Sequence, residues 1–331
     1  MRNVGDVLEA SRHRSVARGA LLVAALHVVG CVGPCEEDYL AGFELVRGDA
    51  LPHGAVRDAQ PFGAGAIAVG DGGAIVRFHA DGLVEIDAGV EADLHALVLA
   101  PDLLVVGAGG TILRSGDGAT WQPVDAGVDA DLYDVDRSWS GDEVVAVGDD
   151  VVLRSTDGGG HWTAITGDAA AGPLRAVAFA DPGFLAFSAS GEVIAIDTAA
   201  GTYAPSGQDL GAAVRNVEYD AVGDAWFMLD DGSIWIGSQA GGGWQFSPGS
   251  SGYCGAVGFR RAGEYVLCDD GRVRDRDEDL DEPALALDPF VPARAAAPVG
   301  ADFVVFGEDG VARLYAPVRG TRPAEYCPQR H

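Results

Sequence analysis

Lysine is absent from this chain, and all 22 of its basic residues are arginines. The 50 aspartates and glutamates outnumber them and give a formal net charge of −28. A surface of this charge repels the phosphates of nucleic acids and anionic lipid headgroups. We therefore expect no nucleic-acid partner.

Helical periodicity is almost absent after residue 32, where turn residues are abundant instead. Glycine occurs 48 times, about twice its usual share. Because glycine weakens helix interiors and favours turns, a helical bundle is disfavoured. Hydrophobic residues make up 48% of the chain, enough to bury a core, so disorder is disfavoured too.

A short apolar run followed by a turn recurs along the chain, most clearly at residues 66–73, 103–110 and 144–150. Fainter copies place the equivalent turn positions at residues 73, 110, 150, 191, 232, 271 and 310. The copies are therefore about forty residues apart, a period typical of β-propellers. Seven such copies predict an all-β fold, a single seven-bladed β-propeller of residues 39–331.

Each copy divides into four strand-like runs separated by turn residues. In the second copy these are residues Leu94–Leu99, Leu103–Gly107, 111–115 and 121–125, of which the fourth is the most polar. This gradient predicts four-stranded antiparallel blades with an exposed outermost strand. The last copy has three runs, and its fourth strand is expected from residues 43–47 or 321–327. Pairing of the N- and C-terminal segments would then close the ring.

Two turns carry a recognisable motif. Ser155, Asp157 and Trp162 have the spacing of the Asp-box, and residues 115–121 form a copy one residue shorter. The motif resembles that of sialidase-like propellers, and residues 107–121 are similar to the repeat of Ycf48-like propellers. In both families the aspartate binds turn amides and the tryptophan packs beneath it. The Ycf48-like resemblance implies an exported, non-enzymatic assembly factor.

The N-terminal thirty residues have the features of an export signal. Four arginines precede an apolar run at 19–30, which is shorter than the roughly 20 residues that a membrane-spanning helix needs. Residues 28–31, Val-Val-Gly-Cys, resemble the lipobox of bacterial lipoproteins. The resemblance implies a signal peptide at 1–30, lipid attachment at Cys31 and a tether at 31–38; Val32 implies the outer membrane. The alternative is an ordinary cleaved signal followed by a structural cysteine.

Four further cysteines remain after Cys31 is assigned to lipid, and an even number in an oxidising compartment suggests two disulfides. We favour Cys254–Cys268, because the segment between them has the pattern of one hairpin. Cys35 and Cys327 would then join the two ends of the mature chain. Zinc binding is the alternative, although no CxxC pair accompanies these positions.

Three arginines, Arg77, Arg114 and Arg154, occupy equivalent positions in the first three copies. Together they predict a basic patch that could dock a partner, and the Ycf48-like resemblance implies the same use. The alternative is that each arginine pairs with an acidic side chain or a carbonyl group within its own blade.

Acidic residues at 275–282 are spaced as in calcium loops but lack the glycine that the EF-hand turn requires. A solvated loop is therefore the favoured interpretation, and no metal or cofactor is expected.

We expect a monomeric, non-catalytic scaffold that binds an unidentified envelope protein or glycan and touches the membrane only through its lipid. The alternative function is a glycan-acting hydrolase of the sialidase-like propeller type.

Overall fold

The computed structural model describes most of the chain beyond residue 35. The described residues are 36–51, 54–168, 172–219, 225–240, 243–248, 256–258, 265–268, 272–275, 285–287, 289, 292–300 and 302–323. Within them the structure is almost entirely β, interrupted by the short 3-10 turns η2 (Asp71–Gly73) and η3 (Ala108–Gly110). None of the helical segments in these residues has the length and apolar character needed to cross a membrane.

The chain divides into two compact units. The larger unit spans residues 39–320 and contains the sheets. The smaller unit combines residues 1–38 with 321–331, of which the structure describes 36–38 and 321–323 as strand ends.

The strands pair into seven sheets within the described residues. Each sheet is called here after its first strand in the order of the repeat. The first strands are β2 (Val56–Phe62), β6 (Leu94–Leu99), β10 (Leu132–Arg137), β15 (Leu174–Ala180), β19 (Val214–Tyr219), β23 (Ala256–Gly258) and β27 (Ala293–Val299). The second strands are β3 (Gly65–Gly70), β7 (Leu103–Gly107), β11 (Val144–Gly148), β16 (Gly183–Ser188), β20 (Ala225–Leu229), β24 (Tyr265–Cys268) and β28 (Asp302–Gly307).

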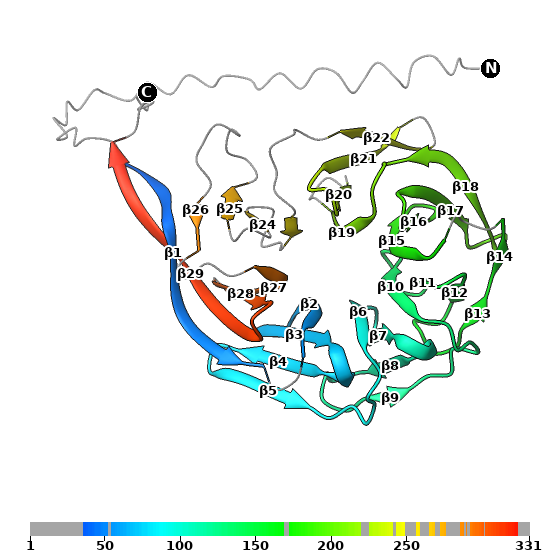
Figure 1. Ribbon diagram of the computed structural model, residues 1–331, viewed down its shortest axis with the longest axis horizontal. Helices are drawn as coiled ribbons and strands as arrows, with labels where there is room; N and C mark the ends of the chain where they lie inside the picture. Colours follow the sequence, from blue (N-terminus) through cyan, green and yellow to red (C-terminus); the bar gives the residue numbers. More distant parts are fainter. Residues whose placement is uncertain are drawn as a thin grey trace, which may run out of the picture. The chain divides into compact units, whose positions relative to one another are not determined.

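The third strands are β4 (Ile75–His79), β8 (Ile112–Ser115), β12 (Val152–Ser155), β17 (Glu192–Asp197), β21 (Ile234–Ala240), β25 (Arg272–Asp275) and β29 (Val311–Pro323). The fourth strands are β5 (Gly82–Ile86), β9 (Gln122–Pro123), β13 (Thr163–Ala164), β18 (Thr202–Asp209), β22 (Gly243–Pro248), β26 (Leu285–Ala286) and β1 (Glu36–Ala50). Within the larger unit the first strands lie on the inner side and the fourth strands on the outer side (Figure 1).

Where the structure describes their side chains, the second strands are largely buried, because neighbouring sheets pack on their faces. In β3 and β7 every residue is buried. Successive side chains of a strand point to opposite faces, so Ile67 packs toward the β6 sheet while Ala66 and Ala68 pack toward the β27 sheet. The two-residue outer strands β9 and β13 are exposed. The polar character expected for the fourth run thus corresponds to an exposed outer strand.

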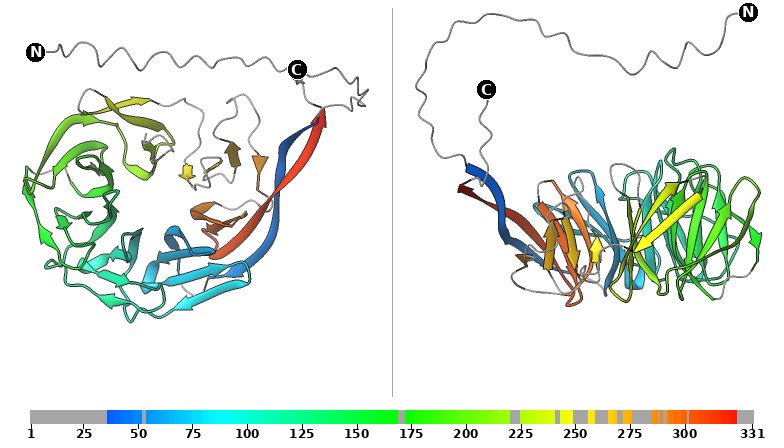
Figure 2. Two further views of the ribbon diagram at one scale, coloured as in Figure 1. Left: turned by 180° about the vertical axis from the view of Figure 1, so that it is seen from behind. Right: turned by 90° about the horizontal axis from the view of Figure 1, so that it is seen from above.

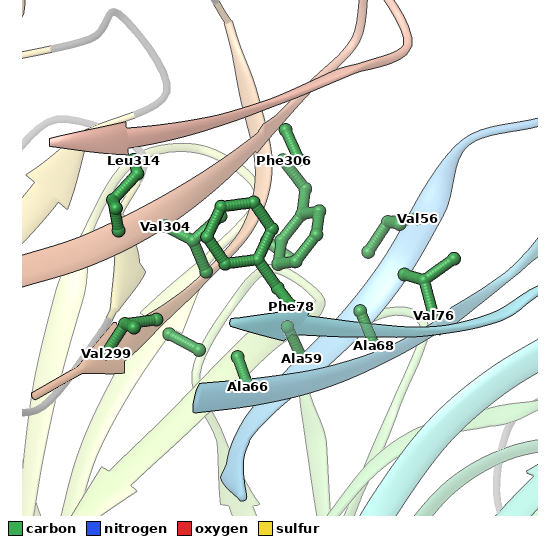
Figure 3. Close-up of a cluster of buried hydrophobic side chains, with 13 residues drawn as sticks. Val56, Ala59, Ala66, Ala68, Val76, Phe78, Val299, Val304, Phe306 and Leu314 are labelled. Carbon is green, nitrogen blue, oxygen red and sulfur yellow. The ribbon is translucent and has the colours of Figure 1, made fainter. Parts of the chain in front are cut away.

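The first and last sheets of the chain pack face to face. Their shared core contains Phe78 from β4 and Phe306 from β28, whose rings meet edge to face with centroids 6.5 Å apart (Figure 3). The first strand of each sheet contacts the first strand of the next, and β27 in turn contacts β2. The last sheet of the larger unit therefore packs against the first.

Of the two segments expected to complete the last sheet, the structure uses the N-terminal one. Strand β1 includes residues 43–47 and pairs with β29, and the two strands run side by side in both views of Figure 2. Phe43 is buried and meets Phe303 edge to face, with ring centroids 5.2 Å apart.

Two details differ from the sequence expectations. A short extra strand, β14 (Thr166–Gly167), pairs parallel with β18 and gives the β15 sheet a fifth strand. In the β23 sheet, Cys268 lies opposite Ala256, so the expected alignment of Cys254 with Cys268 differs from the observed register by two residues. Sequence symmetry about a turn does not determine how many residues the turn consumes, and the register depends on that number.

Candidate functional site

A central cavity of about 600 Å³ is lined by the first strands of six sheets, β2, β6, β10, β15, β19 and β27. Its size falls in the range of ligand-binding clefts, about 300–1,000 Å³. The cavity has three parts: a rim rich in arginine, a middle lined by carboxylates, and an opposite end lined by aromatic side chains.

The arginine rim is built by a backbone irregularity that repeats from sheet to sheet. Near the start of each of these six first strands the pairing register shifts by one residue, as in a β-bulge. A bulge redirects the extra side chain away from the regular alternation. The six extra residues all line the cavity: Arg57, His95, Tyr133, Arg175, Arg215 and Arg294.

Acidic side chains from the neighbouring turns hold three of the rim arginines. Arg57 pairs with Asp71 (2.5 Å) and Asp93 (3.1 Å). Arg215 pairs with Asp230 (3.0 Å), and Arg294 with Glu308 (3.4 Å). Asp71, Asp230 and Glu308 each follow directly after a second strand, so the same position of the repeat supplies all three partners.

The remaining rim residues form a stack across three sheets. The guanidinium of Arg175 lies 3.8 Å from the ring centroid of Tyr133, and the Tyr133 ring stacks on His95 at 5.4 Å. The Tyr133 hydroxyl donates to Asp149 at 3.0 Å, while a ring nitrogen of His95 lies 2.7 Å from the carbonyl oxygen of Leu132. Among the described residues Arg175 has no carboxylate within ion-pair distance, so this exposed guanidinium can receive an external acceptor.

Three half-buried carboxylates line the middle of the cavity and join neighbouring sheets. Asp58 accepts the backbone N–H of Leu97 at 2.8 Å, and Asp134 accepts that of Val177 at 2.7 Å. Asp136 likewise accepts the N–H of Phe179 at 2.7 Å. Each aspartate thus binds an amide on the inner edge of another sheet, where no further strand is available to pair with it.

Burial is the main influence on the pKa values of these three carboxylates, and it raises them. Desolvation by burial raises the pKa of Asp58 and of Asp136 to about 6, although two accepted amide bonds on each act in the opposite direction. The pKa of Asp134 is raised well above its ordinary value, again mainly by desolvation and further by the charges of Asp136 and Asp58.

The opposite end of the cavity is aromatic. Trp139 contacts Phe179 and Tyr219 edge to face, with ring centroids 5.7 and 5.3 Å apart. The Tyr219 hydroxyl donates to the carbonyl oxygen of Phe179 at 2.8 Å and lies 3.4 Å from Asp136. Burial, followed by the charge of Asp136, raises the pKa of Tyr219 far above its ordinary value, so the phenol stays protonated.

The three arginines selected from the sequence lie on third strands, away from the cavity. Arg114 pairs with Asp102 at 2.8 Å and Arg154 with Glu143 at 2.6 Å, while the Arg77 guanidinium lies 5.0 Å from the ring centroid of Phe62. Arg114 and Arg154 thus pair with acids of their own repeats, as the alternative interpretation expects, whereas the contact of Arg77 within its repeat is with an aromatic ring. That the three form a docking patch stays a prediction.

The two aspartates of the Asp-box turns bind the turn amides. Asp157 accepts the N–H groups of Gly160 and His161, and the Trp162 indole donates to the carbonyl oxygen of Gly159 at 3.1 Å. Asp117 accepts two turn amides in the same way, which lowers its pKa to about 2. These contacts fit the structural role that the resemblance implies.

Several expectations concern residues outside the described part of the chain. Cys31, Cys35, Cys254 and Cys327 belong to this group, as does most of the acidic run at 275–282. Lipid attachment, both disulfides and the calcium alternative therefore stay predictions. Within the described residues, no group of three or more histidine, cysteine or carboxylate side chains is placed to hold a metal ion.

The rim residues were not predicted from the sequence, although a signal for them exists. When the first strands are aligned, the residue after the first apolar position is Arg57, His95, Tyr133, Arg175, Arg215 or Arg294. A polar or aromatic side chain that recurs at one fixed position of the repeat, directly after a buried apolar residue, indicates a place where the strand faces an opening rather than a core.

Comparisons with known proteins identify the fold. No protein-family model matches the chain, and no curated protein matches it in sequence. Among solved structures it is similar to YCF48 bound to a D1 peptide, with a TM-score of 0.58 and 13% identity, over 82% of this chain and 95% of that one. YCF48 from Cyanidioschyzon merolae gives a TM-score of 0.59 at 13% identity, over 83% of this chain and 99% of that one. Virginiamycin B lyase from Staphylococcus aureus gives a TM-score of 0.65 at 10% identity, and the match covers 83% of this chain and 100% of the lyase chain. Together with the four-stranded antiparallel sheets, these similarities show that the chain has an all-β, propeller fold.

Proposed function

We propose that the seven sheets are the blades of one closed propeller, and that its central cavity binds a segment of another protein without catalysing a reaction. The contact between β27 and β2, together with the core shared by the first and last sheets, supports closure. A closed ring gives a rigid frame, so the rim side chains keep fixed mutual positions in the absence of a ligand.

The convergence of the six bulge residues on one end of the cavity is the observation that carries this proposal. Four arginines there provide charged donors for carboxylates and carbonyl groups of a polypeptide. Neighbouring acids hold three of them in place, and Arg175 remains available. One of the similar structures, YCF48, is bound to a D1 peptide, which supports peptide binding as a use of this fold.

The absence of catalysis is part of the proposal, because the same fold also occurs in virginiamycin B lyase. A sialidase-type reaction needs a tyrosine nucleophile beside a carboxylate, and Tyr219 with Asp136 is the pair in the cavity that comes nearest to this arrangement. A nucleophile is activated by a lowered pKa or by a base that accepts its proton. Burial raises the pKa of Tyr219, and its hydroxyl donates more closely to the Phe179 carbonyl oxygen, at 2.8 Å, than to Asp136, at 3.4 Å. The pair therefore supports structural use rather than hydrolysis.

Cellular context completes the proposal. The lipobox-like residues 28–31 support attachment through Cys31, which would hold the propeller at the cell envelope as a monomeric scaffold. A lipid anchor confines the cavity to partners at the same membrane. The partner is then an envelope protein with an exposed segment that can enter the cavity.

Site-specific photocrosslinking in the native host tests this function. A photoreactive residue at position 175 lies on the rim, whereas one at position 84 lies on β5, where Val84 is also exposed, at 56%. We expect one discrete protein adduct from position 175 and none from position 84. Equal adducts from both positions, or an adduct from position 84 alone, would contradict binding at the cavity.

A further inference from the structure

The aromatic end of the cavity has an exposed tryptophan held in a fixed position. Trp139 is 62% exposed, more than the other large hydrophobic side chains recorded as exposed in the described residues. Its loop is braced, since Ser138 donates its N–H to the Glu143 carbonyl and Gly141 donates to the Ser138 carbonyl, both at 2.9 Å. The fold therefore presents this indole ring to solvent rather than leaving it on an unstructured loop.

Two further rings support the indole from adjacent sheets. Phe179 comes from β15 and Tyr219 from β19, and both meet Trp139 edge to face. A tryptophan supported in this way keeps an open π surface at the cavity mouth. Such surfaces favour cations over the ring and also suit the C–H faces of sugars.

Charge decides between these two classes of ligand. Asp134 and Asp136 line the cavity beside the aromatic end, and Asp58 contributes a third carboxylate. Arg137 on the same strand offsets one of these charges, and the raised pKa of Asp134 reduces another. The rim arginines Arg57, Arg215 and Arg294 are each paired with an acid, and the whole chain has a net charge of −28. A neutral sugar gains nothing from this field, whereas a cation gains both the ring face and the carboxylates.

We propose that Trp139, Phe179, Tyr219 and Asp136 form a subsite for a basic side chain, arginine or lysine, of the bound protein segment. This inference rests on the proposed function and names what enters the second end of the cavity. The Trp139 ring supplies the cation–π contact, and the carboxylates of the cavity supply the countercharge. The arginine rim at the other end has the opposite preference, so the two ends recognise different parts of one segment.

Binding of a hexa-arginine peptide to the intact protein tests the subsite directly, with affinity measured by calorimetry at physiological salt. Trp139→Ala removes the ring without changing any charge, so attraction to the acidic surface stays the same. We expect this variant to bind about two- to thirtyfold more weakly, the range of one cation–π contact. Asp142→Asn is the matched control: it removes an exposed charge from the same loop and should leave the affinity within about twofold.

Two further measurements complete the test. Acidification from pH 8 to pH 5 should weaken binding to the wild type, because Asp136, with a pKa of about 6, loses its charge over this interval. A neutral disaccharide should not bind. Equal affinity of Trp139→Ala and wild type for the peptide, or Trp139-dependent binding of the disaccharide instead, would overturn the subsite.

Failure of the subsite is distinguishable from failure of the proposed function. Near-ultraviolet circular dichroism of Trp139→Ala verifies that the variant is folded. If crosslinking from position 175 still captures a partner while hexa-arginine ignores Trp139, the cavity binds protein but its second end does not recognise a basic side chain. Absence of any adduct from position 175 in a chain that retains Trp139 would refute the proposed function itself.

Discussion

The three cavity carboxylates should give this protein an unusual dependence of stability on pH. Asp58 and Asp136 have a pKa of about 6 in the folded chain, against an ordinary value of 3.8. Between pH 4 and pH 6 the folded protein therefore binds protons that the unfolded chain has already released. By linkage, the free energy of unfolding falls as the pH rises through this interval and levels off above it.

The size of the effect follows from the two pKa values. The difference between about 6 and 3.8 corresponds to about 3 kcal/mol for each of the two aspartates at most. Asp134 acts in the same direction. Asp117, Asp157, Asp231 and Asp309 act oppositely, because hydrogen bonds lower their pKa and their contribution is lost only below about pH 4. Stability should therefore be greatest between about pH 4 and pH 5.

Urea unfolding at pH values from 4 to 8, followed by tryptophan fluorescence, measures this curve. The double variant Asp58→Asn, Asp136→Asn should lose most of the slope between pH 4 and pH 6. It should also be less stable by a constant amount, about 1–3 kcal/mol for each site, because an asparagine cannot accept both amides. Asp142→Asn removes an exposed carboxylate from the loop of Trp139 and should leave the slope unchanged. A double variant with the wild-type slope would refute the assignment of these groups.

Three other perturbations test the fold and the membrane attachment of the protein. Phe43→Ala in β1 should cost about 3–5 kcal/mol of unfolding free energy, whereas Leu45→Ala on the same strand, 40% exposed, should change it by less than about 0.5 kcal/mol; equal costs would mean that β1 does not pack as the fourth strand. Gly110→Ala should destabilise the protein by more than about 3 kcal/mol, because at a φ of +70° the added Cβ would lie 1.9 Å from the Val128 carbonyl oxygen. Gly109→Ala has a φ of +63° but open space around the added Cβ, so it should cost about 1–2 kcal/mol. Thermal unfolding compares the two variants. Cys31→Ser should abolish incorporation of labelled fatty acid and release the protein from the membrane fraction, and continued labelling would contradict the lipobox interpretation.

The strands were the most predictable part of this molecule. In the second repeat the first two predicted strands, Leu94–Leu99 and Leu103–Gly107, agree with β6 and β7 at every boundary. The repeat itself made this possible, because both strands are almost wholly apolar and end at turn residues, Pro101 and Asp102 after β6 and Gly109 and Gly110 after β7. The shorter fourth strand, β9, was less predictable, since an exposed outer edge imposes little on the side chains.

The site was less predictable than the fold, for a physical reason. Arg114 and Arg154 were selected because they share a position in the repeat, and that reasoning is sound for finding equivalent places. Equivalence does not say whether such an arginine faces a partner protein or an acid of its own sheet. Here Arg114 faces Asp102 and Arg154 faces Glu143. The bulges at Arg57 and Arg175 are properties of backbone pairing, and alternation alone assigns such residues to a strand face instead of a cavity rim.

The cavity carries arginines at one end and carboxylates with aromatic rings toward the other, and the bulge in the first strands produces this difference. Strand β10 places Tyr133 on the arginine rim through its bulge, and Asp134 and Asp136 then follow in the middle of the cavity. Trp139, just beyond the end of the strand, lies at the aromatic end. One short segment therefore contributes to all three parts of the cavity. A protein segment bound along this axis would meet cations at one end and carboxylates with an aromatic face at the other. Reversing the segment would set like charges against each other, at a cost that grows as water is excluded. The cavity should therefore select the direction of its ligand as well as its composition.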